Sequence, residues 1–209
     1  MKGLLLKDLF VVSEFVRVLT LMAIVFIASM MAIDGFSVIG AMISLLVVSL
    51  VISSFSYDDL AHWDSFAATL PVSRRKLVAS KYLFLLLLGV LAVVFNGLVS
   101  VLFAALQPGV SLAEQFVTGI LISMAACIID FVLIPLIYKY GAEKSRMMMM
   151  VIVIIFGITY GGAALLKMLN IGTDWITLPI LIGGIAAAFL ASLLISWICS
   201  VKIVEKKEY

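Results

Sequence analysis

Long runs of apolar residues dominate this chain of 209 residues. Their boundaries are 18–33, 36–55, 82–106, 116–138, 147–166 and 176–201. Only the fourth run contains an acidic or basic residue, which is Asp130. A bilayer core about 30 Å thick takes roughly 20 apolar residues to cross as a helix. The sequence therefore predicts an all-α integral membrane protein with six transmembrane helices in a single domain over 1–209.

The composition excludes several classes of protein. Hydrophobic residues make up 65% of the chain and charged residues 12%, whereas a soluble domain carries about 25% charged residues. With so few charged residues, the chain has too little polar surface to be a water-soluble enzyme, and it is too apolar to be a disordered chain. A net charge of +2 is also far from the strongly basic surface that binds nucleic acid. One histidine and two cysteines leave little material for a metal site, and we expect none.

The basic residues give the orientation. If both termini lie on one side of the membrane, thirteen of the 14 lysines and arginines fall on that side, and Lys167 alone falls on the other. The positive-inside rule makes the rich side cytoplasmic. A cleaved signal peptide over 1–33 is the alternative. Asp8, Ser13 and Glu14 interrupt the apolar stretch 4–16, which favours an uncleaved first span.

Residues 1–17 have a helical pattern of their own. The apolar positions at this spacing are Leu5, Leu6, Leu9, Val12 and Val16, and polar residues including Lys7 and Asp8 form an arc beside them. Such a pattern predicts an amphipathic helix that lies in the membrane interface. The alternative is a plain extension of the first span.

The segment 57–81, between the second and third runs, combines two signals. The polar positions of a helix over 58–70 are Asp58, His62, Ser65 and Thr69, and its apolar positions are Leu60, Trp63, Ala67 and Leu70. Pro71 ends this helix, because the residue before a proline is pushed out of the α region. Ser73 is then placed to cap a new helix that begins at Arg74. On this pattern alone, an interfacial helix with a basic lipid anchor and a protein-contact helix remain equally open.

Three short strings in and around this segment carry a resemblance to a known family. They are DDLAHWD at 58–64, LPVSRRK at 70–76 and SKY at 80–82, and LLLKDL at 4–9 adds to them. Together they resemble the type-2 ATP-binding-cassette (ABC) transporter permeases. More narrowly, they are similar to the small six-span subfamily that includes the phenol-soluble-modulin exporter permeases.

The resemblance implies a permease subunit of an ABC exporter in a bacterial plasma membrane. Such a permease forms a dimer with a second copy or with a similar permease, and membrane lipids surround it. It works with two separate ATPase subunits that bind ATP and Mg. The implied cargo is hydrophobic or amphipathic, with membrane-active peptides favoured. In agreement, the chain contains no Gly-Lys dipeptide and therefore no phosphate-binding G-x-x-x-x-G-K-[ST] loop. We accordingly expect neither an enzyme nor a bound cofactor on this chain.

The resemblance also implies that the loop between the second and third spans contacts the ATPase through a coupling helix. The residues that this assigns to coupling are Asp58, Leu60, Trp63, Asp64, Leu70, Pro71, Arg74 and Arg75. Trp63 is the expected apolar anchor of the contact.

Two polar residues within the apolar runs are candidates for the translocation path, Asn96 and Asp130. An acid at mid-bilayer costs roughly 2.5–3.5 kcal/mol on insertion scales and therefore usually faces protein or water. The alternative for Asp130 is a structural bond or a neutral acid. The alternative for Asn96 is an interhelical amide hydrogen bond.

Two rival functions remain. An ion-coupled secondary transporter usually carries several charges within its spans and internal repeats, and this chain shows one such charge and no visible repeat. A non-transporting immunity or scaffold protein would not need the amphipathic and basic segment 57–81.

Overall fold

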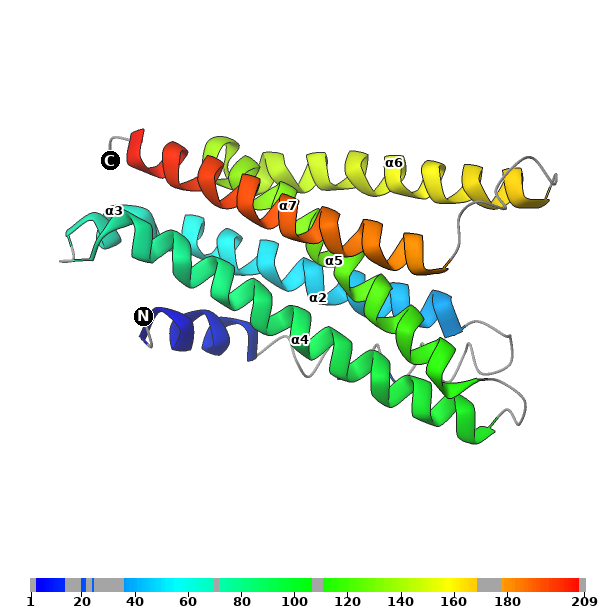
Figure 1. Cartoon of the computed structure of the whole chain (residues 1–209). Coiled ribbons are helices and arrows are strands. Elements are labelled where there is room, and N and C mark those ends of the chain that lie inside the picture. Colours follow the sequence, from blue (N-terminus) through cyan, green and yellow to red (C-terminus); the bar gives the residue numbers. More distant parts are fainter. Residues whose placement is uncertain are drawn as a thin grey trace.

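The protein is a bundle of long helices (Figure 1). The structure is a computed structural model that describes residues 3–13, 20–21, 24, 36–69, 72–106, 111–168 and 178–206. Its labelled helices are α2 (Phe36–Leu60), α3 (Trp63–Thr69), α4 (Arg74–Leu106), α5 (Leu112–Tyr140), α6 (Ala142–Met168) and α7 (Leu178–Lys206). A helix over residues 3–13 precedes them and is called the N-terminal helix below. The described part of the chain contains no strand, which confirms the all-α class.

The long helices match the predicted apolar runs. Within the described residues, four helices are long and apolar enough to cross a membrane: parts of α2, α4 and α7, and all of α5. The run 147–166 lies within α6, and most of the run 18–33 lies outside the described residues. A multi-pass membrane protein is therefore supported, and the full count of six spans stays a prediction.

Helix α5 is the central element of the bundle, because it packs against α2, α4, α6 and α7. Its Phe131 is fully buried, with its ring centroid 6.1 Å from that of Tyr82 on α4 and 5.3 Å from that of Phe189 on α7. The Tyr82 hydroxyl contacts the hydroxyls of Ser196 and Ser200, and Ser196 donates to the carbonyl of Phe131. Rings and hydroxyls thus join three helices at one level.

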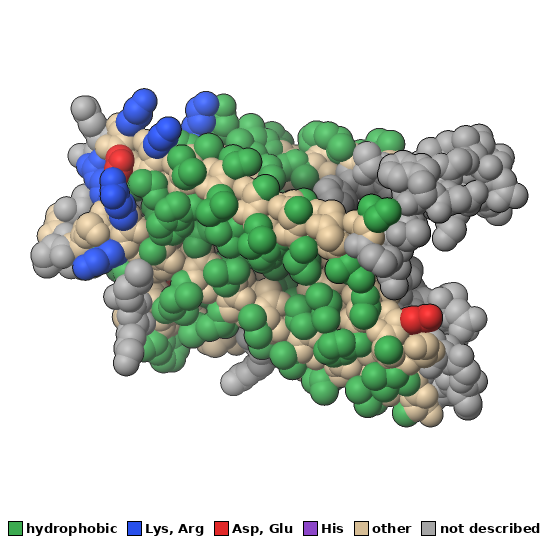
Figure 2. All heavy atoms as spheres, in the orientation of Figure 1, with side chains coloured by type: hydrophobic (Ala, Val, Ile, Leu, Met, Phe, Trp, Pro, Cys, Tyr) green, Lys and Arg blue, Asp and Glu red, His purple; other side chains and the backbone are tan. Residues whose placement is uncertain are grey.

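One end of the bundle carries most of the charged groups that the structure describes. The N-terminal helix, α3 and the end of α7 all lie there (Figure 1). On the face seen in Figure 2, lysine and arginine side chains gather at this end, and hydrophobic side chains cover most of the rest of the described surface. Such a surface fits a protein that presents its long middle to lipid and one charged end to water. We call this end the basic end.

Candidate functional site

The segment 57–81 at the basic end differs from the single amphipathic helix that the sequence predicts over 58–70. Helix α2 continues to Leu60, and α3 begins only at Trp63. His62 has a φ of 49°, in the left-handed region where histidine is enriched among non-glycine residues. This conformation breaks the helix, so Asp58 and Leu60 belong to α2. Leu70 and Pro71 lie outside the described residues, as does the side chain of Asp64.

The start of α4 follows the prediction. The helix begins at Arg74, and the carbonyl of Ser73 accepts hydrogen bonds from the backbone N–H groups of Lys76 and Leu77. Arg74 donates to the last carbonyls of α7, those of Val204 (3.1 Å) and Glu205 (2.9 Å). A cation at a helix C-terminus satisfies free carbonyls and opposes the negative end of the helix dipole. Arg74 therefore fixes the start of α4 against the end of α7.

Arg75 adds an exposed ion pair beside this contact. Its Nε lies 2.8 Å from Oε1 of Glu205, and both side chains are open to solvent. Exposed pairs of this kind contribute between 0 and about 1 kcal/mol to stability. Arg75 is therefore available for contact with another protein at little cost to the fold.

Trp63 does not lie on the outer surface of the segment. It is half-buried and lines a small cavity with residues of the N-terminal helix, α2, α4 and α5. The Lys7 ammonium lies 4.3 Å from the centroid of its ring, which is within cation–π range. Among the described residues of the segment, the exposed large apolar side chains are those of Leu60, at 78%, Phe66, at 54%, and Tyr57, at 43%.

The N-terminal helix is present, but its faces differ from the prediction. Its polar residue Asp8 has no exposed surface (0%), whereas Leu6 and Phe10 are exposed. Asp8 and Lys7 thus face the protein, where they find ionic partners, together with the buried Val12, whereas Leu6, Leu9 and Phe10 face outward. This arrangement fits a helix whose outer face contacts lipid.

A charged network explains the inward polar face. Lys81 on α4 lies 2.8 Å from Oδ1 of Asp8 and 2.6 Å from Oδ2 of Asp58. Lys7 pairs with Asp58 and lies 3.3 Å from Oδ1 of Asp8. The Ser54 hydroxyl, on α2, donates to Asp8 at 3.0 Å. We call Lys7, Asp8, Asp58 and Lys81 the four-charge network.

Of this network, sequence reasoning identified only Asp58 as a site residue. Asp8 and Lys81 are 73 residues apart, so no local pattern connects them. A usable signal did exist, because Asp8 interrupts an apolar stretch and Lys81 directly precedes one. Charges at such positions need partners when their helices pack at membrane depth.

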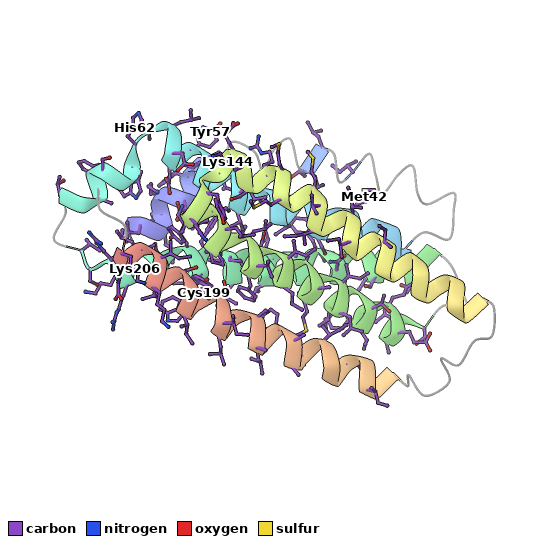
Figure 3. The ribbon with its side chains drawn as sticks, turned by 90° about the horizontal axis from the view of Figure 1, so that it is seen from above. Met42, Tyr57, His62, Lys144, Cys199 and Lys206 are labelled. Carbon is purple, nitrogen blue, oxygen red and sulfur yellow. The ribbon has the colours of Figure 1, made fainter. Side chains whose placement is uncertain are left out.

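Asp59 connects the same segment to the turn between α5 and α6. Its Oδ2 accepts a hydrogen bond of 3.0 Å from the backbone N–H of Ala142, the first residue of α6. The intervening Gly141 has a φ of 84°, which glycine adopts without strain. The labelled side chains of Tyr57, His62 and Lys144 lie at this same end in Figure 3. The end of α2 is thus tied to the α5–α6 turn as well as to the N-terminal helix and α4.

Asn96 lies inside the bundle, with 1% of its surface exposed. Its side-chain amide donates to Ser44 of α2 (3.2 Å) and to Ser123 of α5 (2.9 Å). Gly40 and Gly119 leave the space that its side chain fills, since a Cβ at these positions would lie 2.9 Å and 3.1 Å from Asn96 atoms. The interhelical hydrogen bonds that the sequence left open as an alternative are therefore present.

We predict that Asn96→Ala lowers the free energy of unfolding by about 1 kcal/mol, the size of an interhelical hydrogen bond in a membrane protein. Denaturant unfolding of the detergent-solubilised chain measures this change. The matched control is Ser100→Ala, because the Ser100 hydroxyl donates only to the carbonyl of Asn96 on its own helix. Equal stability of Asn96→Ala and the wild type would contradict the structural role.

Asp130 is also buried, with 3% of its surface exposed. Its Oδ1 has no hydrogen-bond partner among the residues that the structure describes. The described residues hold no group of three or more acids, histidines and cysteines placed to bind a metal ion. Asp130 is thus a buried acid between packed helices with one carboxyl oxygen unpartnered, and the structure does not bring it together with the coupling residues at the basic end.

Comparison with known proteins decides the family. A sequence model described as "ABC-2 family transporter protein" matches residues 3–205. The chain belongs to this family. Members of the ABC-2 family are membrane subunits of transporters rather than enzymes, and the family implies an ABC ATPase as partner. No curated protein and no solved structure matches the chain.

Proposed function

We propose that this ABC-2 permease is the membrane subunit of an exporter for hydrophobic or amphipathic cargo, with membrane-active peptides as the favoured class. The observation that carries the proposal is the match to an ABC-2 transporter over residues 3–205, on a chain whose long helices are apolar outside. The narrower likeness to phenol-soluble-modulin exporter permeases supports the choice of peptides. A translocation path lined by apolar side chains also suits cargo that partitions into lipid.

In the proposed assembly the permease works with a second permease, either another copy or a similar chain. Two ATPase subunits bind ATP and Mg and attach at the basic end. This end then faces the cytoplasm of a bacterial cell, with both termini on that side of the plasma membrane. The support is electrostatic, since the lysine-rich and arginine-rich side of a membrane protein is the cytoplasmic one.

The proposed ATPase contact is the outer surface of segment 57–75. Leu60 and Phe66 supply its two most exposed large apolar side chains, and Arg75 supplies an exposed charge within the same segment. Interfaces gain most of their energy from a few apolar or arginine anchors that become desolvated. The partly buried Trp63 packs against Phe66, with 5.5 Å between the two ring centroids, and so helps to hold the Phe66 side chain in place.

The proposal is tested by co-purification. Affinity-tagged permease is purified in mild detergent after co-expression with candidate ABC ATPases from the same organism, and ATP hydrolysis is measured with and without amphipathic peptides. We expect a stable complex whose hydrolysis rises with peptide. A permease that retains no ATPase, in any detergent that keeps it folded, would contradict the exporter assignment.

The proposed topology gives a labelling prediction. Single cysteines at Lys144 and Lys206, in a background without Cys127 and Cys199, should be protected from a membrane-impermeant thiol reagent in intact cells. A cysteine at the exposed Glu114, at the opposite end of α5, should react. Labelling of Lys144→Cys in intact cells would contradict a cytoplasmic basic end.

Asp130 is the proposed polar group of the translocation path, because it is an acid within an apolar span. Asp130→Asn keeps the size of the side chain and removes the ionisable group. We expect export to fall while the amount of protein in the membrane and its bound ATPase stay the same. Export at the wild-type rate would leave Asp130 with a structural role only.

A further inference from the structure

The four-charge network is unusually complete around Lys81. A lysine ammonium has three donors, and Lys81 has three acceptors, which are Asp8 at 2.8 Å, Ser54 at 2.8 Å and Asp58 at 2.6 Å. Its ammonium also lies 4.7 Å from the centroid of the Phe55 ring. Only 7% of the Lys81 side chain and none of the Asp8 side chain are exposed. The three acceptors around Lys81 therefore suit a compact ammonium group.

The network balances its charges, with two lysines against two aspartates, and it joins three separate segments. Asp8 and Lys7 belong to the N-terminal helix, Asp58 to the last turns of α2, and Lys81 to α4. Lys7 extends the connection to α3 through the ring of Trp63. Each segment thus contacts the others through charged groups, and removal of any one of them leaves the buried network with unbalanced charge.

Helix α3 needs such support. It has seven residues, and a helix this short is not stable in isolation. Its contacts to the rest of the described chain run through α2 and through the cavity that Trp63 and Ala67 line with Lys7, Asp8 and Lys81. A segment that transmits a movement must not unfold or bend locally. The four-charge network lies beside that cavity and is placed to hold α3 firmly against the helices that line it.

We propose that Asp8 and Lys81 are positioning residues for energy coupling. With Lys7 and Asp58 they hold the N-terminal helix, the end of α2 and the start of α4 as one rigid unit against α3, so that motion of α3 moves α4. This inference rests on the proposed function, in that α3 is taken as part of the ATPase contact. It assigns the N-terminal helix a role in coupling in addition to membrane anchoring.

The chemistry predicts a pattern of rescue. Lys81→Met leaves both aspartates with Lys7 as their one cation in the network. Adding Asp8→Asn restores the balance, because Lys7 and Asp58 remain paired and the new amide accepts and donates hydrogen bonds. Lys81→Arg keeps the charge but replaces a compact ammonium by a planar guanidinium, which does not fit three acceptors arranged around one nitrogen. We therefore expect rescue by Asp8→Asn and not by arginine.

The first measurement uses the full chain in lipid nanodiscs without ATPase. Amide hydrogen exchange of residues 3–13 reports how often the N-terminal helix opens locally. We expect Lys81→Met to lower protection about a hundredfold, the effect of breaking buried ion pairs and leaving Asp8 and Asp58 to share Lys7, and Lys81→Met/Asp8→Asn to return it to near wild type. The control is Glu205→Gln, which removes the exposed ion pair at the same end and should change nothing over residues 3–13. Unchanged protection in Lys81→Met would overturn the proposal.

The second measurement uses the permease with its bound ATPase in proteoliposomes. The ratio of peptide transported to ATP hydrolysed should fall in Lys81→Met and Lys81→Arg and recover in the Lys81→Met/Asp8→Asn double variant. Normal coupling in Lys81→Met, with the N-terminal helix loosened, would overturn the positioning role and leave the exporter function intact. Absence of ATPase from the wild-type permease would instead contradict the exporter function itself, and the coupling role with it.

Discussion

Replacing Phe66 by alanine should weaken the complex between permease and ATPase about thirtyfold. Phe66 exposes 54% of its surface in the short helix α3, although it is a large aromatic side chain. Truncating an aromatic anchor at an interface costs about 2 kcal/mol or more, and each 1.4 kcal/mol is tenfold in affinity. Titration of the detergent-solubilised permease with purified ATPase measures the dissociation constant directly.

The matched control for Phe66→Ala is Phe10→Ala. Phe10 is similarly exposed, but it lies on the outward face of the N-terminal helix, where lipid is the expected neighbour. Its replacement should leave ATPase affinity unchanged. Equal affinities for wild type and Phe66→Ala would exclude α3 as the contact and favour an interfacial lipid anchor.

The largest loss of stability is expected from Phe131→Ala. Phe131 is fully buried in α5 and contacts the rings of Tyr82 on α4 and Phe189 on α7. Truncating a buried phenylalanine costs about 3–5 kcal/mol, because the cavity that it leaves is only partly filled by relaxation. Packing supplies most of the attraction between helices in a membrane, so thermal unfolding should shift strongly downward.

Two comparisons keep this prediction specific. Leu194→Ala removes an exposed side chain from α7 and should have little effect on unfolding. Phe131→Leu refills most of the volume and should recover most of the lost stability. A midpoint for Phe131→Ala that equals that of Leu194→Ala would show that the ring contacts do not hold α4, α5 and α7 together.

The parts of the fold that could be predicted from the sequence are those with a local cause. The long apolar runs correspond to helices because a bilayer demands continuous apolar length. The start of α4 at Arg74 agrees with the helix start that the sequence predicts after Pro71 and Ser73. Asn96 was recognised as a polar group within a span, and its two serine partners supply the interhelical bonds that such a group requires.

The parts that sequence reasoning missed depend on distant partners. No glycine or proline marks the break at His62, so the pattern over 58–70 indicated one helix where the chain forms two. The polar residues of the N-terminal helix were expected beside water, yet Asp8 is buried by its contact with Lys81. Trp63 was expected at the surface, and the Lys7 side chain covers its ring instead.

The measurement that tests the central claim most directly is transport of a fluorescent amphipathic peptide in sealed proteoliposomes. These contain the permease together with its ATPase, and ATP is supplied on the side of the basic end. We expect peptide movement that requires ATP hydrolysis, stops with a hydrolysis-deficient ATPase, and is unaffected by collapse of ion gradients. Movement that continues without ATPase and disappears when the gradients collapse would contradict the central claim and identify a secondary transporter.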